Sequence, residues 1–186
     1  MEKVLLYCGA ELDEKRAASI LQSLGMNLMI IKESDLGQTL GYLAGRDGFE
    51  KTEAAVSKSF TESFMILDQV EDERILAISK AFEAAGMPYR GIKAMITEHN
   101  QHWKMADLFQ EVSLEHAYFD ELSNLQQLLQ EVNTYASKDY TENSWMRFQA
   151  AMLEAYMVYQ SRPEQIRELT KAKAQLLGAI EQLETI

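Results

Sequence analysis

The sequence predicts an α/β fold, in which a small, mainly parallel sheet of four strands with flanking helices is followed by an all-α three-helix bundle. Short apolar runs alternate with helical patterns in the first 115 residues, which is typical of βαβ units. Between Ser113 and Pro163 there is neither glycine nor proline, and apolar residues recur at intervals of three and four. We therefore expect two domains, an α/β domain over residues 1–115 and a bundle over residues 116–186.

Each predicted strand is a continuous apolar run, as expected for strands that are covered on both faces. The runs are Val4–Cys8, Leu28–Ile31, Phe64–Leu67 and, within a strand over 92–97, Ala94–Ile96. A helix that begins at Asp13 links the first two strands, and a helix over Asp72–Ala85 links the last two, since both stretches space their apolar residues at helical intervals. Asp35 is expected to cap a short helix over Leu36–Ala44.

Two sheet topologies fit this order of elements. Residues 32–63 are long enough for a crossover helix between the second and third strands, which favours a parallel sheet. The alternative is an α+β ferredoxin-like sheet. In the parallel sheet, the carboxyl ends of the strands would bring Cys8–Gly9, Lys32–Glu33, Asp68 and Thr97–Asn100 to one edge, where open α/β sheets bind ligands.

An internal repeat is indicated by a shift of 61 residues. This shift places Leu5-Leu6 on Ile66-Leu67 and Gly25-Met26 on Gly86-Met87. The pattern predicts two copies of one βαβ unit.

The second domain is predicted to begin with a helix whose apolar stripe consists of Tyr118, Leu122, Leu125, Leu129 and Val132. Thr141 is the expected N-cap of the next helix, with Tyr140 and Trp145 as a hydrophobic staple. That helix is predicted to bury Trp145, Phe148, Met152, Ala155 and Tyr156. Pro163 is expected to open the last helix.

Two resemblances to known families accompany these patterns. Gly37-Gln-Thr-Leu-Gly-Tyr-Leu43, the residues Lys93, Thr97, Asn100 and Trp103, and the strand Val4–Tyr7 resemble an uncharacterised bacterial domain of unknown function, over about residues 1–116. That family usually has glycine and an aromatic residue where this chain has Cys8-Gly9. The run Tyr140-Thr-Glu-Asn-Ser-Trp145 and the segment Ala174–Leu183 resemble FIVAR-type three-helix modules of bacterial surface and carbohydrate-active proteins, over about residues 116–186.

Composition narrows the range of partners. The net charge is −11, so the chain lacks the basic surface that nucleic acids and anionic membranes require. A single cysteine permits no internal disulfide, and the first residues do not resemble a signal peptide. We expect a cytoplasmic protein without a cofactor.

Candidate site residues lie in two segments. Thr97, His99, Asn100 and Trp103 follow the fourth strand, and Asn100 is expected to be the N-cap of the next helix. Gly37 and Gln38 could present backbone donors to an anion. His99 and His102 are candidate metal ligands, with Glu98, Asp107 or His116 as a third.

The function that we expect from these patterns is non-catalytic. The α/β domain would bind a protein or a small ligand, and the bundle would serve packing or self-association into a homodimer. The alternative is an enzyme or metal-dependent ligand binder that uses the Thr97–Trp103 edge.

Overall fold

The computed structural model describes residues 2–53, 56 and 58–186 of the chain. The chain divides into two compact units, Met1–Ser113 and Leu114–Ile186. The division falls close to the boundary expected from the sequence. That the units are independently stable domains stays a prediction.

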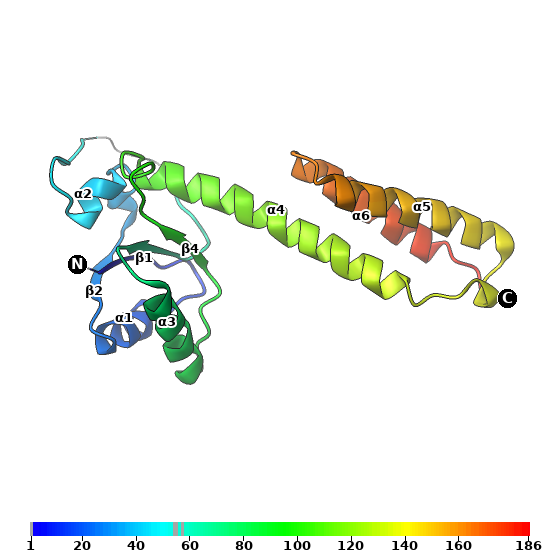
Figure 1. The fold of residues 1–186 in the computed structure, drawn as a ribbon, viewed down its shortest axis with the longest axis horizontal. Helices are drawn as coiled ribbons and strands as arrows, with labels where there is room; N and C mark the ends of the chain where they lie inside the picture. The colour runs from blue at the N-terminus through cyan, green and yellow to red at the C-terminus, as the bar shows by residue number, and fades with distance from the viewer. Residues whose placement is uncertain (1, 54–55, 57) are drawn as a thin grey trace. The chain divides into compact units, whose positions relative to one another are not determined.

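The first unit contains a four-stranded sheet in the order β2-β1-β3-β4 (Figure 1). Its strands are β1 (Lys3–Tyr7), β2 (Asn27–Ile30), β3 (Phe64–Asp68) and β4 (Ile92–Met95). The pairs β1–β2 and β3–β4 are parallel, while the central pair β1–β3 is antiparallel. The predicted fold class, an α/β sheet followed by a helical bundle, is therefore confirmed, and two of the three strand pairings are parallel.

The antiparallel central pair corrects the expectation of a single ligand edge. Because β1 and β3 run in opposite directions, Cys8 and Lys32 lie at one end of the sheet, while Asp68 and Thr97 lie at the other. A sheet with all four strands parallel, and the ferredoxin-like alternative, are both wrong for this chain. The long connection between β2 and β3 allows either strand direction, so its length could not decide between them.

Helices cover both faces of the sheet. The helices α1 (Glu14–Ser23) and α3 (Asp72–Ala84) pack on the face formed by Val4, Leu6, Met65 and Leu67. The helix α2 (Leu40–Ala44) and the first turns of α4 (Met105–Val132) pack on the opposite face (Figure 1). Asp13 caps α1 as expected, since its carboxylate accepts a hydrogen bond from the backbone N–H of Arg16 at 3.0 Å. The short helix α2 is capped by Thr39 and not by Asp35, which lies in a separate 3₁₀ turn, Glu33–Asp35.

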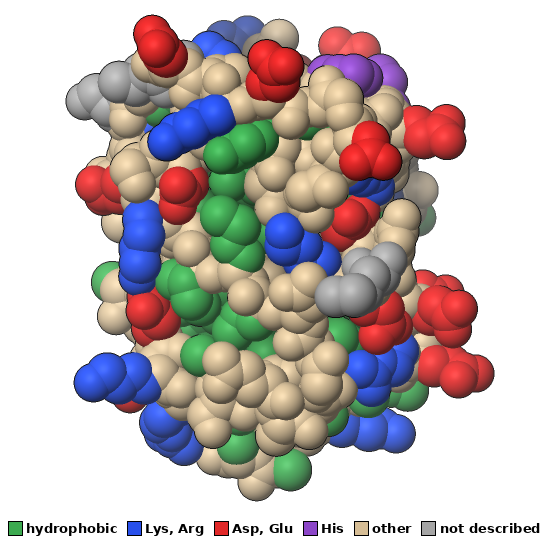
Figure 2. Space-filling model, turned by 90° about the vertical axis from the view of Figure 1, so that its left-hand side faces the viewer, with side chains coloured by type: hydrophobic (Ala, Val, Ile, Leu, Met, Phe, Trp, Pro, Cys, Tyr) green, Lys and Arg blue, Asp and Glu red, His purple; other side chains and the backbone are tan. Residues whose placement is uncertain are grey.

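The strands β2 and β4 are the edges of the sheet. Figure 2 views the protein from the side where Figure 1 shows β2, and a band of hydrophobic surface runs down this face between charged side chains. Flanking charges of this kind disfavour edge-to-edge pairing of sheets.

The first unit is built from two equivalent halves. The βαβ unit β1–α1–β2 corresponds to β3–α3–β4, and the central pair is symmetric about Leu5 and Ile66, which face each other. The backbone N–H of Ile31 donates to Leu6, as that of Ile96 donates to Leu67. The repeat predicted from the 61-residue shift is thus visible as a repeat of structure.

The second unit contains the remainder of α4 with α5 (Glu142–Ser161) and α6 (Ile166–Glu181). Its buried core combines residues from all three helices, among them Leu125, Phe148 and Leu169. Thr141 occupies the N-cap position of α5, but its side chain accepts no capping hydrogen bond, and its hydroxyl donates to the Ser144 hydroxyl at 2.9 Å. The rings of Tyr140 and Trp145 stack with their centroids 5.8 Å apart, as the predicted staple requires.

The end of the chain closes this unit. Tyr140 forms a bridge with Thr185, and the backbone N–H of Thr141 donates to the Glu184 carbonyl at 2.8 Å. The buried Ser144 hydroxyl accepts from the Glu184 N–H at 3.1 Å. One prediction for α5 is wrong, because Tyr156 is 51% exposed and does not belong to the core.

Candidate functional site

The segment that follows β4 forms a self-contained turn. The Thr97 N–H donates to the Asn100 side-chain oxygen at 2.8 Å, and the Asn100 N–H donates to the Thr97 hydroxyl at 3.2 Å. The Asn100 amide nitrogen donates to the Met95 carbonyl at 2.9 Å. Asn100 is therefore not an N-cap as expected, because α4 begins only at Met105. Its side chain instead bonds the backbone that leaves the strand.

The equivalent turn after β2 uses the same bond. The Lys32 N–H donates to the Asp35 carboxylate at 2.9 Å, across the same interval of three residues as the bond between Thr97 and Asn100. Asp35 and Asn100 thus occupy corresponding positions, 65 residues apart, in the two halves of the unit. Because the same hydrogen bond closes the turn in both halves, the repeated fold explains it without a ligand.

The two segments that contain the candidate site residues are related by the internal repeat, and they are hydrogen-bonded to each other. Thr39 forms an antiparallel bridge with Lys104. On either side of this bridge the Leu40 N–H donates to the Trp103 carbonyl at 3.0 Å, and the Met105 N–H donates to the Gln38 carbonyl at 2.9 Å. The structure therefore brings together two segments that are about 60 residues apart in the sequence.

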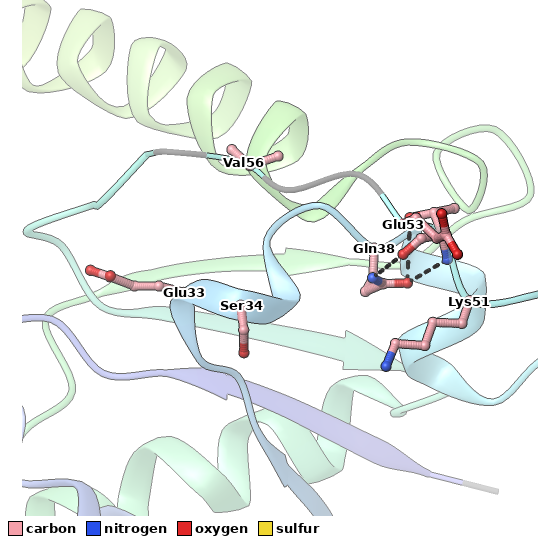
Figure 3. A pocket seen from close by; sticks show the side chains of 7 residues that line it. Glu33, Ser34, Gln38, Lys51, Glu53 and Val56 are labelled. Carbon is pink, nitrogen blue, oxygen red and sulfur yellow. Dashed lines mark hydrogen bonds between the residues drawn. The ribbon is translucent and has the colours of Figure 1, made fainter.

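Gln38 lies beside a pocket of about 720 Å³ but is bonded within the protein (Figure 3). Its side-chain nitrogen donates to the Thr52 carbonyl at 2.7 Å, and its oxygen accepts from the Thr52 N–H at 2.8 Å. The Gly37 carbonyl accepts from the Thr52 hydroxyl at 2.9 Å. Both residues are buried, and they anchor the segment around Thr52.

A close packing contact explains why a glycine stands at position 41 of the segment Gly37–Leu43. A Cβ atom at Gly41 would come within 2.6 Å of the Phe49 ring, so any larger residue would displace that ring. The Phe49 ring lies 4.9 Å from the His102 ring.

The candidate metal ligands face different aromatic rings. His99 packs against Trp103 with ring centroids 5.7 Å apart, while His102 packs against Phe49. Within the part of the chain that the structure describes, no group of three or more His, Cys, Asp or Glu side chains is arranged to hold a metal ion. The arrangement of these side chains therefore does not support the metal site predicted at His99 and His102.

Cys8 lies at the opposite end of the sheet from His99, half-buried among apolar side chains of the α1 and α3 face. Burial, with the nearby Glu14 carboxylate, raises the pKa of its thiol from 9.0 to about 11. Lys32 lowers this pKa to a smaller extent. The thiol is therefore protonated at neutral pH, which is the reverse of what a nucleophile needs.

A polar cluster that the sequence did not single out lies where β1 begins and β3 ends. Lys3 and Asp68 face each other in register on these two strands. Arg46 follows the α2 C-cap Gly45, and its Nη2 atom lies 2.5 Å from the Asp68 carboxylate. Its Nη1 atom donates to the Gln101 side chain at 2.8 Å. Asp68 is only 4% exposed, so its charge is balanced by Arg46 inside the protein.

This cluster lines a cleft of about 840 Å³, together with Asn27 and Glu98. The Arg46 Nε atom is buried and has no hydrogen-bond partner among the described residues. A buried donor without an acceptor costs about 1–3 kcal/mol. The Arg46 side chain as a whole is 22% exposed at this cleft. Of the four residues Lys3, Arg46, Asp68 and Gln101, only Asp68 is predicted from the sequence to lie at the ligand-binding edge of the sheet.

The two ends of the central strand pair have different chemistry. By the internal symmetry, Tyr7 corresponds to Asp68, and Phe64 corresponds to Lys3. Tyr7 and Phe64 join Phe60 and Phe109 in an aromatic cluster, in which the Phe64 and Phe109 rings stack 3.8 Å apart. One end of the repeat is therefore filled by rings, whereas the equivalent end carries the polar cleft.

Fold and site together describe an α/β domain with a polar cleft, joined to a helical unit. Residues 63–119 match a family described only as a domain of unknown function, DUF3783. This match spans β3, α3, β4, the turn at Thr97–Trp103 and the start of α4, and it supports the expectation of an uncharacterised domain family over this part of the chain. The resemblance of Val4–Tyr7 and Gly37–Leu43 lies outside the match and stays a prediction. Comparisons with curated proteins and with solved structures give no match. The resemblance of residues 116–186 to FIVAR-type modules stays a prediction. None of the described helices has the length and apolar character needed to cross a bilayer.

Proposed function

We propose that this chain is a non-catalytic binding protein whose α/β unit takes a small polar ligand in the cleft at Arg46 and Asp68. The helical unit pairs with a second copy of the chain. The observation that carries the ligand proposal is the Arg46 guanidinium, which Asp68 and Gln101 hold at the wall of the cleft while the Arg46 side chain stays 22% exposed.

The chemistry of the cleft favours a ligand that offers hydrogen-bond acceptors. Arg46 donates in a fixed planar geometry, which suits carboxylate and phosphate oxygens. Lys3 adds a second cation at the same place, although its ammonium already donates to the Leu43 carbonyl at 2.7 Å. The carboxylates of Asp47 and Glu98 line the cleft as well and would repel a ligand of high negative charge. A small carboxylate or monophosphate with further polar groups fits this balance.

The binding role does not depend on a nucleophile. Among the described residues that line this cleft none is histidine or cysteine, and Cys8, the single cysteine of the chain, lies at the other end of the sheet with a raised pKa. The acidic chain does not favour nucleic acid, and the lone cysteine fits a reducing compartment, so we place its action in the cytoplasm.

The test is a thermal-shift screen of the full chain with small carboxylates, monophosphates, nucleotides and divalent metals. A ligand that binds the native state raises its melting temperature by mass action. We expect a carboxylate or phosphate compound to raise the melting temperature of the wild type, and Arg46→Gln to abolish this response.

Arg74→Gln is the matched control, because Arg74 also forms an ion pair, with Glu2 at 3.1 Å, but is not among the residues that line the cleft. A response that survives in Arg46→Gln would contradict the proposed cleft. A response to metals alone would favour the metal-dependent alternative.

A further inference from the structure

The helix α5 is apolar on two sides, and only one of them is covered within its unit. Its inner side contributes Phe148 and Ala155 to the core. On its outer side Met146 and Met157 are each 63% exposed and Leu153 is 58% exposed. A helix that carries apolar residues on both sides is typical of a helix that is buried between two partners.

These exposed residues form a continuous ridge. Met146, Ala150, Leu153 and Met157 follow one another at intervals of four, three and four residues, which places them on one line along the helix. Apolar repeats of this spacing form the contact seam between paired helices. We call these four residues the α5 ridge.

A groove runs beside the ridge. It has a volume of about 440 Å³ and lies between α4 and α5, with Leu129, Met152, Tyr156 and Tyr159 as its larger apolar walls. Leu153 borders both the ridge and the groove. The remaining walls are the uncharged side chains of Gln126, Gln130 and Asn133.

Charge argues for a second copy of this chain as the occupant. The chain carries a net charge of −11, so two copies repel each other wherever their acidic surfaces meet. None of the groove residues and none of the ridge residues is Asp, Glu, Lys or Arg. The ridge and groove residues of two copies can therefore meet without opposing like charges, and the nearest acidic side chain on α5 is the exposed Glu154 beside the ridge.

Shape supports the same occupant. A two-fold axis brings the same surface of both copies together, so a self-pairing surface must contain both a projection and a matching recess. The α5 ridge and the adjacent groove provide both. We propose that two copies pair through α5, with the two helices antiparallel and crossing near Leu153, so that the ridge of each copy fills the groove of the other.

This inference rests on the proposed pairing role of the helical unit and names the face that performs it. The experiment is sedimentation velocity of the full chain over a range of concentrations. The wild type should sediment as a dimer of twice the 21.2 kDa chain mass. Leu153→Glu should weaken the dimer by at least about tenfold, because it places two carboxylates close to the two-fold axis. Far-UV circular dichroism checks that the variant is folded.

The matched control is Leu76→Glu, the same substitution at a leucine of α3 that is 55% exposed and lies outside the face. It should leave the dimer unchanged. A second test mixes Leu153→Glu chains with Leu153→Lys chains. The mixture should form tighter dimers than either variant alone, because opposite charges then meet across the axis.

The outcomes separate the two proposals. A wild type that stays monomeric at the highest concentration would overturn the pairing role together with the face, and the ridge would then serve another partner. A wild-type dimer that persists in Leu153→Glu would leave pairing intact and refute the α5 face. Mixed variants that stay monomeric would refute the crossing at Leu153.

Discussion

Replacing Phe109 with alanine should remove the largest of the side chains with which the first turns of α4 pack against the sheet. Phe109 is fully buried, its ring stacks on Phe64 at 3.8 Å, and it meets the edges of Tyr7 and Phe60 at 5.4 and 5.2 Å. Truncation of a buried phenylalanine costs about 3–5 kcal/mol. Because each aromatic pair adds about 0.5–1.5 kcal/mol beyond burial, we expect a loss in the upper part of that range.

The chain offers a way to assign this loss to one unit. It has two tryptophans, Trp103 in the first unit and Trp145 in the second. In a Trp145→Phe background, urea unfolding followed by fluorescence reports the first unit alone. The Phe109→Ala transition should move to lower urea with an unchanged slope. Leu114→Ala is the control, since this leucine is 62% exposed on the same helix. A loss of less than about 2 kcal/mol for Phe109→Ala would refute the packing role of the aromatic cluster.

Two further predictions concern the turns and the cysteine. Asp35→Ala should lower the free energy of unfolding by about 1 kcal/mol, since it removes the turn bond from the Lys32 N–H. Asn100→Ala should cost at least as much, because it removes the equivalent bond from the Thr97 N–H and also the bond to the Met95 carbonyl, while Asn100→Asp retains the acceptor and should cost less than Asn100→Ala. Urea unfolding of the three variants tests this, and a smaller loss for Asn100→Ala than for Asp35→Ala would argue against equivalent turns. With its pKa at about 11, Cys8 should react with iodoacetamide at pH 8 about a hundredfold more slowly than an unperturbed cysteine. The unfolded chain loses this proton near pH 9.0 and the folded chain near 11, so the contribution of the thiol to stability is full below pH 9.0 and falls as the pH rises toward 11. Urea midpoints at pH 8 and 10 should therefore differ more for the wild type than for Cys8→Ala, and equal differences would contradict the raised pKa.

The elements of this protein could be predicted because their signals are local. The apolar runs at Val4–Cys8 and Phe64–Leu67 gave two strands within one residue of their observed ends. The spacing around Thr141 predicted the N-cap position and the staple of α5, since both depend on residues within about one turn of the helix. The turn residue Asn100 was recognised, but its role was misassigned, because a side chain that caps a helix and one that closes a turn after a strand have the same sequence preference.

The candidate site depended on contacts that no local pattern contains. The apolar pattern of a strand is the same whether its neighbour is parallel or antiparallel, so the direction of β3 beside β1 could not be read from either strand. That direction separated Cys8 from Asp68 and placed Asp68 opposite Lys3. Arg46 reaches this pair only because α2 packs over the sheet and ends at Gly45. The sequence by itself determined where the helices and strands lie, since their hydrophobic periods are local. The tertiary structure alone decided which polar residues share the cleft, because strand order and direction are set by packing between distant segments.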